Sequence, residues 1–568
     1  MNAGLLLAHF NRISNAPGAV PRLRKFILDL AVRGKLVQQN ANDEPASLLA
    51  GRASRLAFSL DSPPPFSIPT SWVWVRLGDI CSKTGSGSTP RGGKSVYQAS
   101  GVPFLRSQNV YNDGLRLDDV AYISQDTHER MSGTAVAPND ILLNITGGSI
   151  GRSCIVRNDL GEANVSQHVA IIRVAIADIH LYLHRLILSP YFQSFVISEQ
   201  TGAGRGGLPK NRMDQLPVAL PPLAEQHRIV ARVDELMEVC DRLEAKQRDR
   251  IVSRDRLAAA SYHHLNNGAD AEVLRGHAQF FIKHLPTLTT CTNQLKQLRQ
   301  SIQTLAVRGK LVPQMNDEET ASNLIQRIQA ERRDLIRRRV IKAKLLNASD
   351  CQGKSLVALP NTWQWLTLGQ LLVFGPQNGI SPSASSRPDA PKAITLTATT
   401  SGVFKPNYFK QIEANIPRDS EFWLRDGDLL FQRGNTREYV GMAAYFDGED
   451  GQFLYPDLII KVRVSKFVDL RFVHLCSTAP YARAYFGNHA TGAQATMPKI
   501  NHEILLNLPV PLPPIAEQHR IVAKVDDLMA LCDQLEASLT IAQTEASRLL
   551  ESVLHRTLEA QRYDMIEG

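Results

Sequence analysis

The chain carries one sequence pattern twice, and this internal duplication constrains the fold more than any other feature. Residues 216–245 recur at 508–537 with 23 of 30 positions identical, at an offset of 292. The segment LAVRGKLV at 30–37 recurs unchanged at 305–312, at an offset of 275. Collinear repeats of this kind indicate duplicated structural units. We therefore expect two halves of one architecture, which divide near residue 280.

A third repeated pair opens a long block in each half. PTSWVWVRLG at 69–78 aligns with PNTWQWLTLG at 360–369. The residues that follow are rich in short apolar runs, Gly, Asn and Asp, and each block closes at L-P-x-x-L-P-P. This composition is typical of α/β or mostly-β domains. We predict that the tryptophans of the opening motif pack in the domain core and do not stack on bases.

A long helix should follow each block, starting at A-E-Q-H-R-I-V. In the second half, apolar or small residues recur in steps of three and four, which predicts a coiled-coil seam. They are Ile521, Val525, Leu528, Cys532, Leu535, Leu539, Ala542, Ala546, Leu549 and Val553. A shorter helix should precede each block and stop at Gly34 or Gly309, which look like helix terminators.

We predict an α+β fold in which two long antiparallel helical spacers separate two globular α/β domains. The repeat favours a circular arrangement with pseudo-two-fold symmetry, in which the first and last helices pair and the chain ends lie side by side. The predicted segments are an N-terminal helical segment (1–68), a first domain (69–224), a central helical spacer (225–359), a second domain (360–515) and a C-terminal helix (516–568).

The second half carries an insertion. The offset between repeats grows from 275 to 291, and the extra residues include ERRDLIRRRVIKAK at 331–344. A solvated helical extension is one explanation for this basic segment, and a contact with DNA phosphates is the other.

Charge and cysteine content limit the function classes. The 568 residues carry a net charge of +9, which is a weak indication of an anionic partner. Residues 69–224 hold 14 basic and 12 acidic side chains, and residues 360–516 hold 14 and 13. Any DNA face in these blocks must therefore be a local concentration of charge. The seven cysteines form no C-x-x-C pair, which disfavours a structural zinc site or a disulfide framework. We expect no signal peptide and no membrane span, and hence a cytoplasmic protein.

Catalytic signatures are near misses. Residues 87–95 resemble a phosphate-binding loop, but Ser88 stands where the first glycine of that motif belongs. The repeated His227 and His519 have no carboxylate or cysteine partner at catalytic spacing. We therefore predict no catalytic residue and no metal site, and we favour a binding protein.

The duplicated motifs resemble the specificity subunit of type I restriction–modification systems. The resemblance rests on the two P-x-x-W-x-W-x-x-L-G openings, the two L-P-P-[LI]-A-E-Q-H-R-I-V exits and the two L-A-V-R-G-K-L-V segments. It covers essentially the whole chain. It implies a non-catalytic subunit with two target-recognition domains, each reading a different half of a split DNA sequence. The helical spacers would set the gap between the half-sites and hold the modification subunits.

The resemblance also implies partners and cofactors. The expected partners are double-stranded DNA, two modification subunits with adenine-N6 methyltransferase activity, and two ATP-driven restriction subunits. No cofactor is expected on this chain, whereas S-adenosylmethionine, ATP and Mg are expected on the partner subunits.

Two other function classes stay open. A fused methyltransferase or nuclease would need a cofactor domain, for which the duplication leaves little chain. A stand-alone DNA-binding regulator would bind DNA tightly without partners. For a specificity subunit, we expect the isolated chain to bind DNA poorly until the modification subunits dock.

The first candidate DNA-contacting loop is glycine-rich and recurs in both halves. It comprises residues 201–213, and its counterpart is 491–501. Arg, Lys, Asn and Gln supply many contacts to phosphates and base edges. Lys210 and Lys499 follow proline in both loops, which suggests a shared phosphate contact.

Two further loop groups complete the candidate DNA surface. The second comprises 82–94 and 104–109 with the counterpart 375–383, and the third comprises 144–152 with the counterpart 431–437. The candidate DNA-binding residues of all three groups are Lys94, Arg106, Gln108, Asn109, Arg205, Lys210, Arg212, Gln377, Asn378, Gln432, Arg433, Asn435, Arg437 and Lys499.

The exit motif supplies the candidate partner-binding residues, because the resemblance implies that these helices hold the modification subunits. The candidates are Glu225, Gln226, His227, Arg228, Glu517, Gln518, His519 and Arg520.

Overall fold

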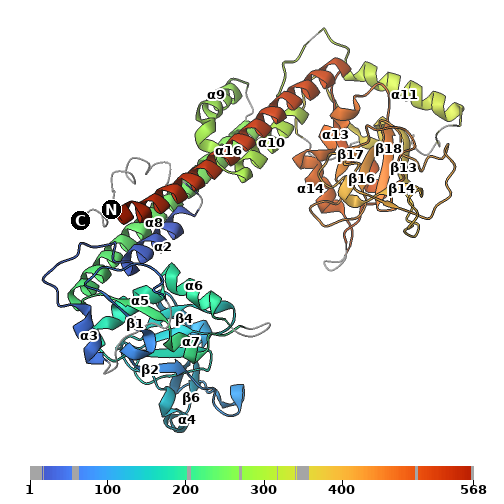
Figure 1. Cartoon of the computed structure of the whole chain (residues 1–568). Coiled ribbons are helices and arrows are strands. Elements are labelled where there is room, and N and C mark those ends of the chain that lie inside the picture. The colour runs from blue at the N-terminus through green and yellow to red at the C-terminus, as the bar shows by residue number, and fades with distance from the viewer. Residues whose placement is uncertain are drawn as a thin grey trace. The chain divides into compact units, whose positions relative to one another are not determined.

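A computed structural model of the chain divides into two compact units. Unit one comprises residues 1–250 and 541–568, and unit two comprises residues 251–540. Both boundaries fall inside long helices, α8 (Leu223–Asn267) and α16 (Ile515–Tyr563) (Figure 1). The structure describes residues 16, 18–53, 63–200, 206–267, 271–315, 317–339, 341, 357–492 and 497–563.

The globular domain of unit one, domain one, is built on short, mostly antiparallel strands. A ribbon of β1 and β11 joins the opening motif to the exit motif, and a four-stranded sheet has the order β2-β10-β7-β8. A three-stranded sheet has the order β6-β3-β9, and β4 and β5 form a hairpin. The strands are β1 (Val73–Arg76), β2 (Cys81–Ser86), β3 (Val102–Leu105), β4 (Val110–Tyr111), β5 (Gly114–Leu115), β6 (Ala121–Ile123), β7 (Ile141–Asn144), β8 (Ser153–Ile155), β9 (Asn164–Val165), β10 (Val169–Val174) and β11 (Pro217–Leu220).

Unit two repeats this design in its own globular domain, domain two. The ribbon is β12-β19 and the four-stranded sheet has the order β13-β18-β16-β17, while β14 and β15 pair separately. The strands are β12 (Gln364–Thr367), β13 (Leu372–Asn378), β14 (Lys392–Ile394), β15 (Phe409–Gln411), β16 (Leu429–Gln432), β17 (Ala443–Tyr445), β18 (Ile459–Val464) and β19 (Pro509–Leu512).

The strand registers identify equivalent positions in the two sheets. Val169 of β10 lies opposite Asn144 of β7, and Ile459 of β18 lies opposite Gln432 of β16. Asn144 and Gln432 are therefore equivalent, although these two strands are not related by one constant offset in the sequence. The sheets share one backbone frame while the side chains placed on it differ.

Helices cover the sheets. In unit one, α5 packs beside β8, and in unit two, α13 packs beside β17 (Figure 1). The domain helices of unit one are α4 (Gln125–Arg130), α5 (His180–Ile187), α6 (Pro190–Ser198) and α7 (Lys210–Asp214). Those of unit two are α12 (Leu368–Leu371), α13 (Leu470–Thr478), α14 (Pro480–His489) and α15 (His502–Leu506).

The short helices before the domains end where the sequence predicts. The helix α2 (Ala19–Val32) stops before Gly34, and α10 (Thr292–Val307) stops before Gly309. Both glycines have positive φ angles, 69° and 67°, a conformation that residues with a Cβ adopt at a cost. The other helices outside the domains are α3 (Ala46–Ala53), α9 (Ala271–Leu288) and α11 (Ala321–Arg337).

The ends of the two long helices pack in equivalent ways. In unit one, Leu550 and Val553 near the end of α16 bury against Ala16 and Ala19, at the start of α2. In unit two, Tyr262 near the end of α8 packs in a cluster with residues of α9 and α10. The predicted pairing of the first and last helices is therefore confirmed for the described residues; residues 1–15 of the predicted N-terminal helical segment lie outside them. The circular arrangement stays a prediction.

The insertion of the second half extends α11 and is not wholly solvated. Arg332 is 3% exposed and donates to the carbonyl of Gln370 at 2.9 Å. Glu331 accepts a hydrogen bond from Ser465. The helix therefore packs against domain two at α12 and just after the end of β18, which corrects the expectation of a purely solvated extension. Residues 342–350 lie outside the described residues.

Candidate nucleic-acid interface

In domain one, loops from all three predicted groups meet at one end of the four-stranded sheet. Thr146, which follows β7, forms an antiparallel bridge with Gly207 of the exit loop. The amide of Gly87, which follows β2, donates to the carbonyl of Val169 at 2.8 Å. We call this end the loop end; it comprises residues 86–88, 144–147, 166–168 and 206–210.

Domain two has the same loop end, comprising residues 378–380, 432–435, 456–458 and 497–502. Gly434 forms the antiparallel bridge here, with Lys499. The amide of Gly379 donates to the carbonyl of Ile459 at 3.3 Å. Loops that are far apart in sequence therefore converge in both domains, and they do so on equivalent backbone positions.

The predicted equivalence of the two lysines is wrong. The bridges align Lys499 with Gly207, and the first residues of α7 and α15 align Lys210 with His502. The common Pro-Lys pair therefore occupies different places on the shared frame. Lys210 forms an ion pair with Asp214.

Two predicted DNA-contacting residues are buried. Asn109 is 1% exposed and its Nδ2 donates to the carbonyl of Arg116 at 2.9 Å. Gln432 is fully buried and its Nε2 donates to the carbonyl of Leu396 at 2.8 Å. Both amides hold loop backbone in place, and their burial corrects the prediction that they contact DNA.

Three other candidates of domain one carry acidic partners. The side chains of Arg106 and Gln108 both bond to Asp119, with the Gln108 Nε2 donating to its carboxylate at 2.5 Å. Arg212 lies 3.4 Å from a carboxylate oxygen of Glu199. Contact of these three residues with DNA stays a prediction. DNA would have to compete with these ion pairs and hydrogen bonds for the three side chains.

The candidates on β13 of domain two are half-buried and hydrogen-bonded. The Gln377 Oε1 accepts from the Tyr455 hydroxyl at 3.2 Å. The Asn378 Oδ1 lies 2.9 Å from the His502 Nε2. Burial, followed by the positive charge of Arg433, lowers the pKa of His502. His502 was not among the predicted site residues, although it begins a helix at the exit of the domain.

The candidates after β16 differ in exposure. Arg433 is half-buried, whereas Arg437 is exposed and donates to the carbonyl of Gly487 at 3.4 Å. The Asn435 Nδ2 donates to the Gln432 Oε1 at 2.5 Å. Arg205 and the Lys94 side chain lie outside the described residues.

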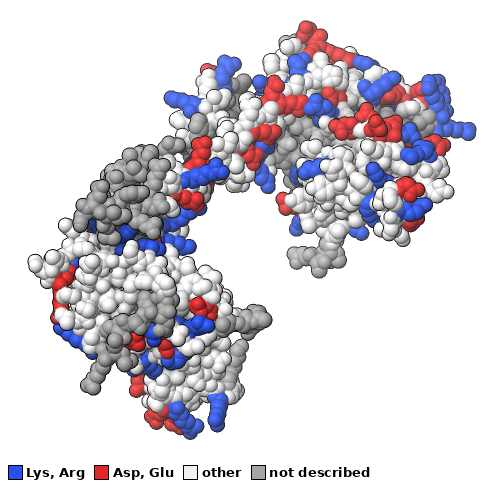
Figure 2. Space-filling view, viewed as in Figure 1, with Lys and Arg blue, Asp and Glu red and all other residues white. Residues whose placement is uncertain are grey.

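The charge pattern agrees with near-neutral domains. On the face shown in Figure 2, basic and acidic side chains are interspersed and neither domain carries an unbroken field of one sign. Any attraction to phosphates must therefore come from a few local cations.

A buried glutamate at the exit motif ties each domain to its helices. In unit one, Glu225 accepts from the Trp72 Nε1 at 2.9 Å and from the Gln39 Nε2 at 2.6 Å. Burial raises the pKa of Glu225, and these hydrogen bonds oppose the shift. One carboxylate thus joins α8, the opening motif and the segment after α2.

Unit two repeats this network residue for residue. Glu517 accepts from the Trp363 Nε1 at 2.9 Å and from the Gln314 Nε2 at 2.5 Å. The sequence carries a signal for it, because Gln39 and Gln314 both follow the repeated L-A-V-R-G-K-L-V segment. Trp72 and Trp363 are core residues, as predicted, with 6% and 4% exposure, whereas Trp74 and Trp365 of the same motifs are half-buried.

The predicted partner-binding set therefore divides into buried and exposed members. Gln226 and Gln518 are fully buried and donate to the carbonyls of Pro221 and Pro513, both at 2.9 Å. These two amides and the two buried glutamates cannot form a partner surface, which corrects the prediction for them.

The other members of the set lie nearer the surface. His227 and His519 are exposed. Arg228 pairs with Asp43 at 2.6 Å, and Arg520 pairs with Glu318. Partner binding by these four residues stays a prediction.

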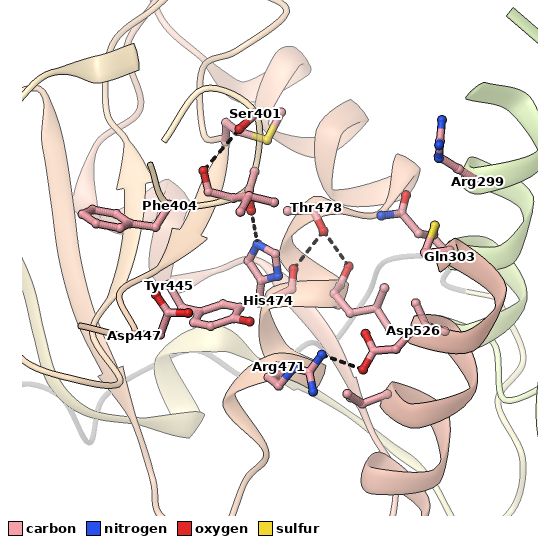
Figure 3. A pocket seen from close by; sticks show the side chains of 17 residues that line it. Arg299, Gln303, Ser401, Phe404, Tyr445, Asp447, Arg471, His474, Thr478 and Asp526 are labelled. Carbon is pink, nitrogen blue, oxygen red and sulfur yellow. Dashed lines mark hydrogen bonds and ion pairs between the residues drawn. The ribbon is translucent and has the colours of Figure 1, made fainter. Parts of the chain in front are cut away.

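A cleft of about 660 Å³ lies in unit two, where α10 and α16 meet domain two (Figure 3). Several of its polar side chains are engaged with one another or with backbone. Arg471 pairs with Asp526 at 2.6 Å, and the His474 Nε2 lies 2.8 Å from the carbonyl of Gly402. The cleft lies among structural contacts, beside β17 and not at the loop end.

The described part of the chain holds no cluster of three or more His, Cys, Asp or Glu side chains placed to bind a metal ion. Within the same residues, none of the helices combines the length and apolar character that a membrane span needs.

Comparisons with known proteins agree with this architecture. The model of the family "Type I restriction modification DNA specificity domain" matches residues 69–252 and 360–544. The EcoEI specificity subunit of Escherichia coli is 26% identical over 567 residues, covering 95% of this chain and 94% of its own. The EcoAI specificity subunit of Escherichia coli is also 26% identical and covers 94% of this chain and 93% of its own.

Solved structures with detectable similarity include the HsdS subunit from Thermoanaerobacter tengcongensis. It is 17% identical, covers 87% of this chain and 98% of its own, and superposes with a TM-score of 0.41. A chain from a study of type I R-M complex assembly and conformational transition is 18% identical, covers 87% of this chain and 99% of its own, and has a TM-score of 0.48.

Each family match begins at an opening motif and runs through the domain into the long helix that follows. The two matches together span more than half of the chain. The chain therefore belongs to the family of type I restriction–modification specificity subunits, whose role is to give the complex its DNA sequence specificity.

Proposed function

We propose that each domain reads one half of an asymmetric, split DNA site through its loop end. The observation that carries this proposal is that the two domains share one backbone arrangement at the loop end but place different side chains on it. Equivalent backbone positions bear Thr146 in one domain and Gly434 in the other, and Lys210 in one and His502 in the other. Base edges are distinguished by the hydrogen-bonding groups presented to them, so the two domains should prefer different sequences.

The two long helices are proposed to set the gap between the half-sites and to dock the modification subunits. In unit two, helices α8 and α9 expose large apolar side chains, which are more often found at interaction surfaces than on solvated helices. These are Ile251, Leu257, Phe280 and Ile282, each at least 43% exposed. The exposed His227 and His519 at the starts of α8 and α16 are further docking candidates.

The specificity role implies DNA and other subunits of the complex as partners. We propose two modification subunits, which bind S-adenosylmethionine, and two restriction subunits, which bind ATP and Mg. A partner that is chromosomal DNA also favours the cytoplasm as the site of action. The buried glutamates, Glu225 and Glu517, would act by fixing each domain on its helices.

The test is to map N6-methyladenine across a genome in cells that express the chain with its modification subunit. The expected result is one bipartite motif with two different halves and a gap of fixed length. A continuous or palindromic motif would contradict the two-domain proposal. Tight, sequence-specific binding by the isolated chain would favour a stand-alone regulator, and S-adenosylmethionine binding by the isolated chain would favour a fused enzyme.

A further inference from the structure

The two bridges at the loop ends occupy the same position. The glycine of the bridge stands on the exit loop in domain one and on the loop after β16 in domain two. In domain one the bridge joins Thr146 to Gly207, and in domain two it joins Gly434 to Lys499. Neighbouring hydrogen bonds confirm the equivalence. The amide of Leu208 donates to the carbonyl before Thr146 at 2.9 Å, and the amide of Ile500 donates to the carbonyl before Gly434 at 2.8 Å.

Each bridge holds one side chain and one glycine, and a second Cβ would fit only if its neighbour moved. A Cβ placed on Gly207 would lie 3.2 Å from the Thr146 Cγ2. A Cβ placed on Gly434 would lie 3.2 Å from the Lys499 Cγ. Both distances are tighter than ordinary van der Waals contact, so a side chain enters the shared space from one loop in domain one and from the other loop in domain two.

The chemistry presented at this position differs between the domains. In domain one the Thr146 Oγ1 lies 2.7 Å from the Nδ1 of the exposed His168, so a hydroxyl and an imidazole are presented together at this position. In domain two, Leu458 occupies the position of His168. The carbonyl of His168 accepts the amide of Ile145, which follows β7, and the carbonyl of Leu458 accepts the amide of Arg433, which follows β16.

Lys499 itself is exposed, and the described residues provide no acidic partner for its ammonium group. Its sequence neighbours from 493 to 498 are also without an acid. Lys210 in domain one, by contrast, is neutralised by Asp214. An exposed cation without a counter-ion at the tip of a converging loop group is available to a DNA acceptor.

We propose that this bridge is a specificity-determining position in both domains. Lys499 reads a guanine in the half-site of domain two, because a lysine ammonium pairs with the O6 and N7 acceptors that guanine displays in the major groove. The Thr146–His168 pair reads the corresponding position in the half-site of domain one. This inference rests on the proposed function and names the residues that carry its sequence preference.

The test compares N6-methyladenine motifs from cells that express the modification subunit with wild-type or variant chain. For Lys499→Ala, preference should be lost at one G·C position in one half of the motif, with the other half unchanged. For Thr146→Val, which removes the hydroxyl and keeps the shape, preference should relax at one position in the other half. Lys466→Ala, at an exposed lysine of domain two outside the loop end, is the matched control and should leave the motif unaltered.

The outcomes separate this inference from the proposed function. An unaltered motif with Lys499→Ala, accompanied only by lower occupancy, would show a phosphate contact and overturn the inference while the proposed function stands. No bipartite motif with the wild-type chain would overturn both. If Lys499→Ala fails to accumulate, Lys499→Gln retains the stem and a donor while removing the charge, and an unaltered motif with it overturns the inference equally. Lys499→Arg should keep the guanine preference of the wild type, because arginine also pairs with the O6 and N7 of guanine.

Discussion

At the scale of single residues, buried polar groups hold the domains on their helices. Glu225 and Glu517 each accept an indole N–H and an amide N–H in the protein interior. A buried donor that loses its acceptor keeps its desolvation cost, which is about 1–3 kcal/mol for each group. These carboxylates should therefore matter more to stability than any surface ion pair of the exit motif, for which about 1 kcal/mol or less is expected.

Replacing Glu517 should destabilise unit two. We expect Glu517→Ala to lower the free energy of unfolding by about 2–4 kcal/mol, because Trp363 and Gln314 both lose their acceptor. Glu517→Gln should cost less, since one acceptor oxygen remains. Urea denaturation of the full chain measures the difference. Glu503→Ala, an exposed site on α15, is the control, and equal stability of Glu517→Ala and this control would contradict the assignment.

His184 should make stability depend on pH. It is 5% exposed and its Nε2 lies 3.1 Å from the carbonyl of Ser153. Burial lowers the pKa of His184 from 6.5 to about 4. Between these values the unfolded chain binds the extra proton and the folded chain does not, so stability is complete above pH 6.5 and falls as the pH drops towards 4. The loss from this group should approach about 3 kcal/mol.

The measurement is a thermal or urea unfolding series between pH 7.5 and pH 5 for the wild type and for His184→Gln. The variant should show a weaker pH dependence than the wild type. Identical pH profiles would show that His184 is not the titrating group. Burial also lowers the pKa of the equivalent His474, so the variant should keep part of the dependence.

At the scale of elements, the helix terminators couple local conformation to packing. Gly34 ends α2 with a φ of 69°, and a Cβ there would lie 2.5 Å from the Pro69 Cγ. Gly309 stands in the same relation to Pro360. Each glycine therefore has two roles: it adopts the left-handed turn, and its lack of a Cβ lets the first residue of the opening motif approach closely.

Gly34→Ala should therefore cost more than the left-handed conformation alone. Gly18 provides a matched control in the same unit, because its φ is 68° and nothing lies within 4 Å of a Cβ placed there. We expect Gly18→Ala to cost about 1 kcal/mol and Gly34→Ala at least about 2 kcal/mol, from strain plus the clash. Differential scanning calorimetry measures both. Equal costs would mean that the close approach to Pro69 does not contribute to the loss of unfolding free energy.

At the scale of the whole molecule, we propose that the long helices act as spacers between the two domains. One heptad adds about 10 Å to an α-helix at about 1.5 Å per residue. That length corresponds to about three base pairs of DNA at about 3.4 Å each. Residues 540–545 in the middle of α16 are exposed, so a heptad inserted there would not interrupt a tightly packed core.

Inserting one matched heptad into α8 near Arg250 and into α16 near Thr540 should change the gap and leave both half-sites unaltered. The expected methylation motif has the same two halves with a gap about three base pairs longer. Insertion into α16 alone is the control and should abolish methylation, because the two spacers would no longer match in length. An unchanged gap with the double insertion would show that the helices do not set the spacing.

Local sequence patterns predicted the two domains of this protein and the helices that flank them. Two repeated motifs locate the domains, the heptad pattern identifies the long helix, and Gly34 and Gly309 mark helix ends, because periodicity and φ preferences are local properties. Membership of a specificity family also followed from the motifs, since they lie at the ends of the domains, where both halves agree.

Which side chains share a site could not be predicted, because it depends on contacts between segments far apart in the sequence. The bridges showed that Lys499 is equivalent to Gly207, and burial removed Asn109 and Gln432 from the DNA-contacting set. Glu225 is likewise buried, so it is an internal hydrogen-bond acceptor and not the docking residue that was predicted. The physical reason is that strand pairing and burial depend on partners distant in sequence, so identical dipeptides in two loops can occupy different positions on one frame.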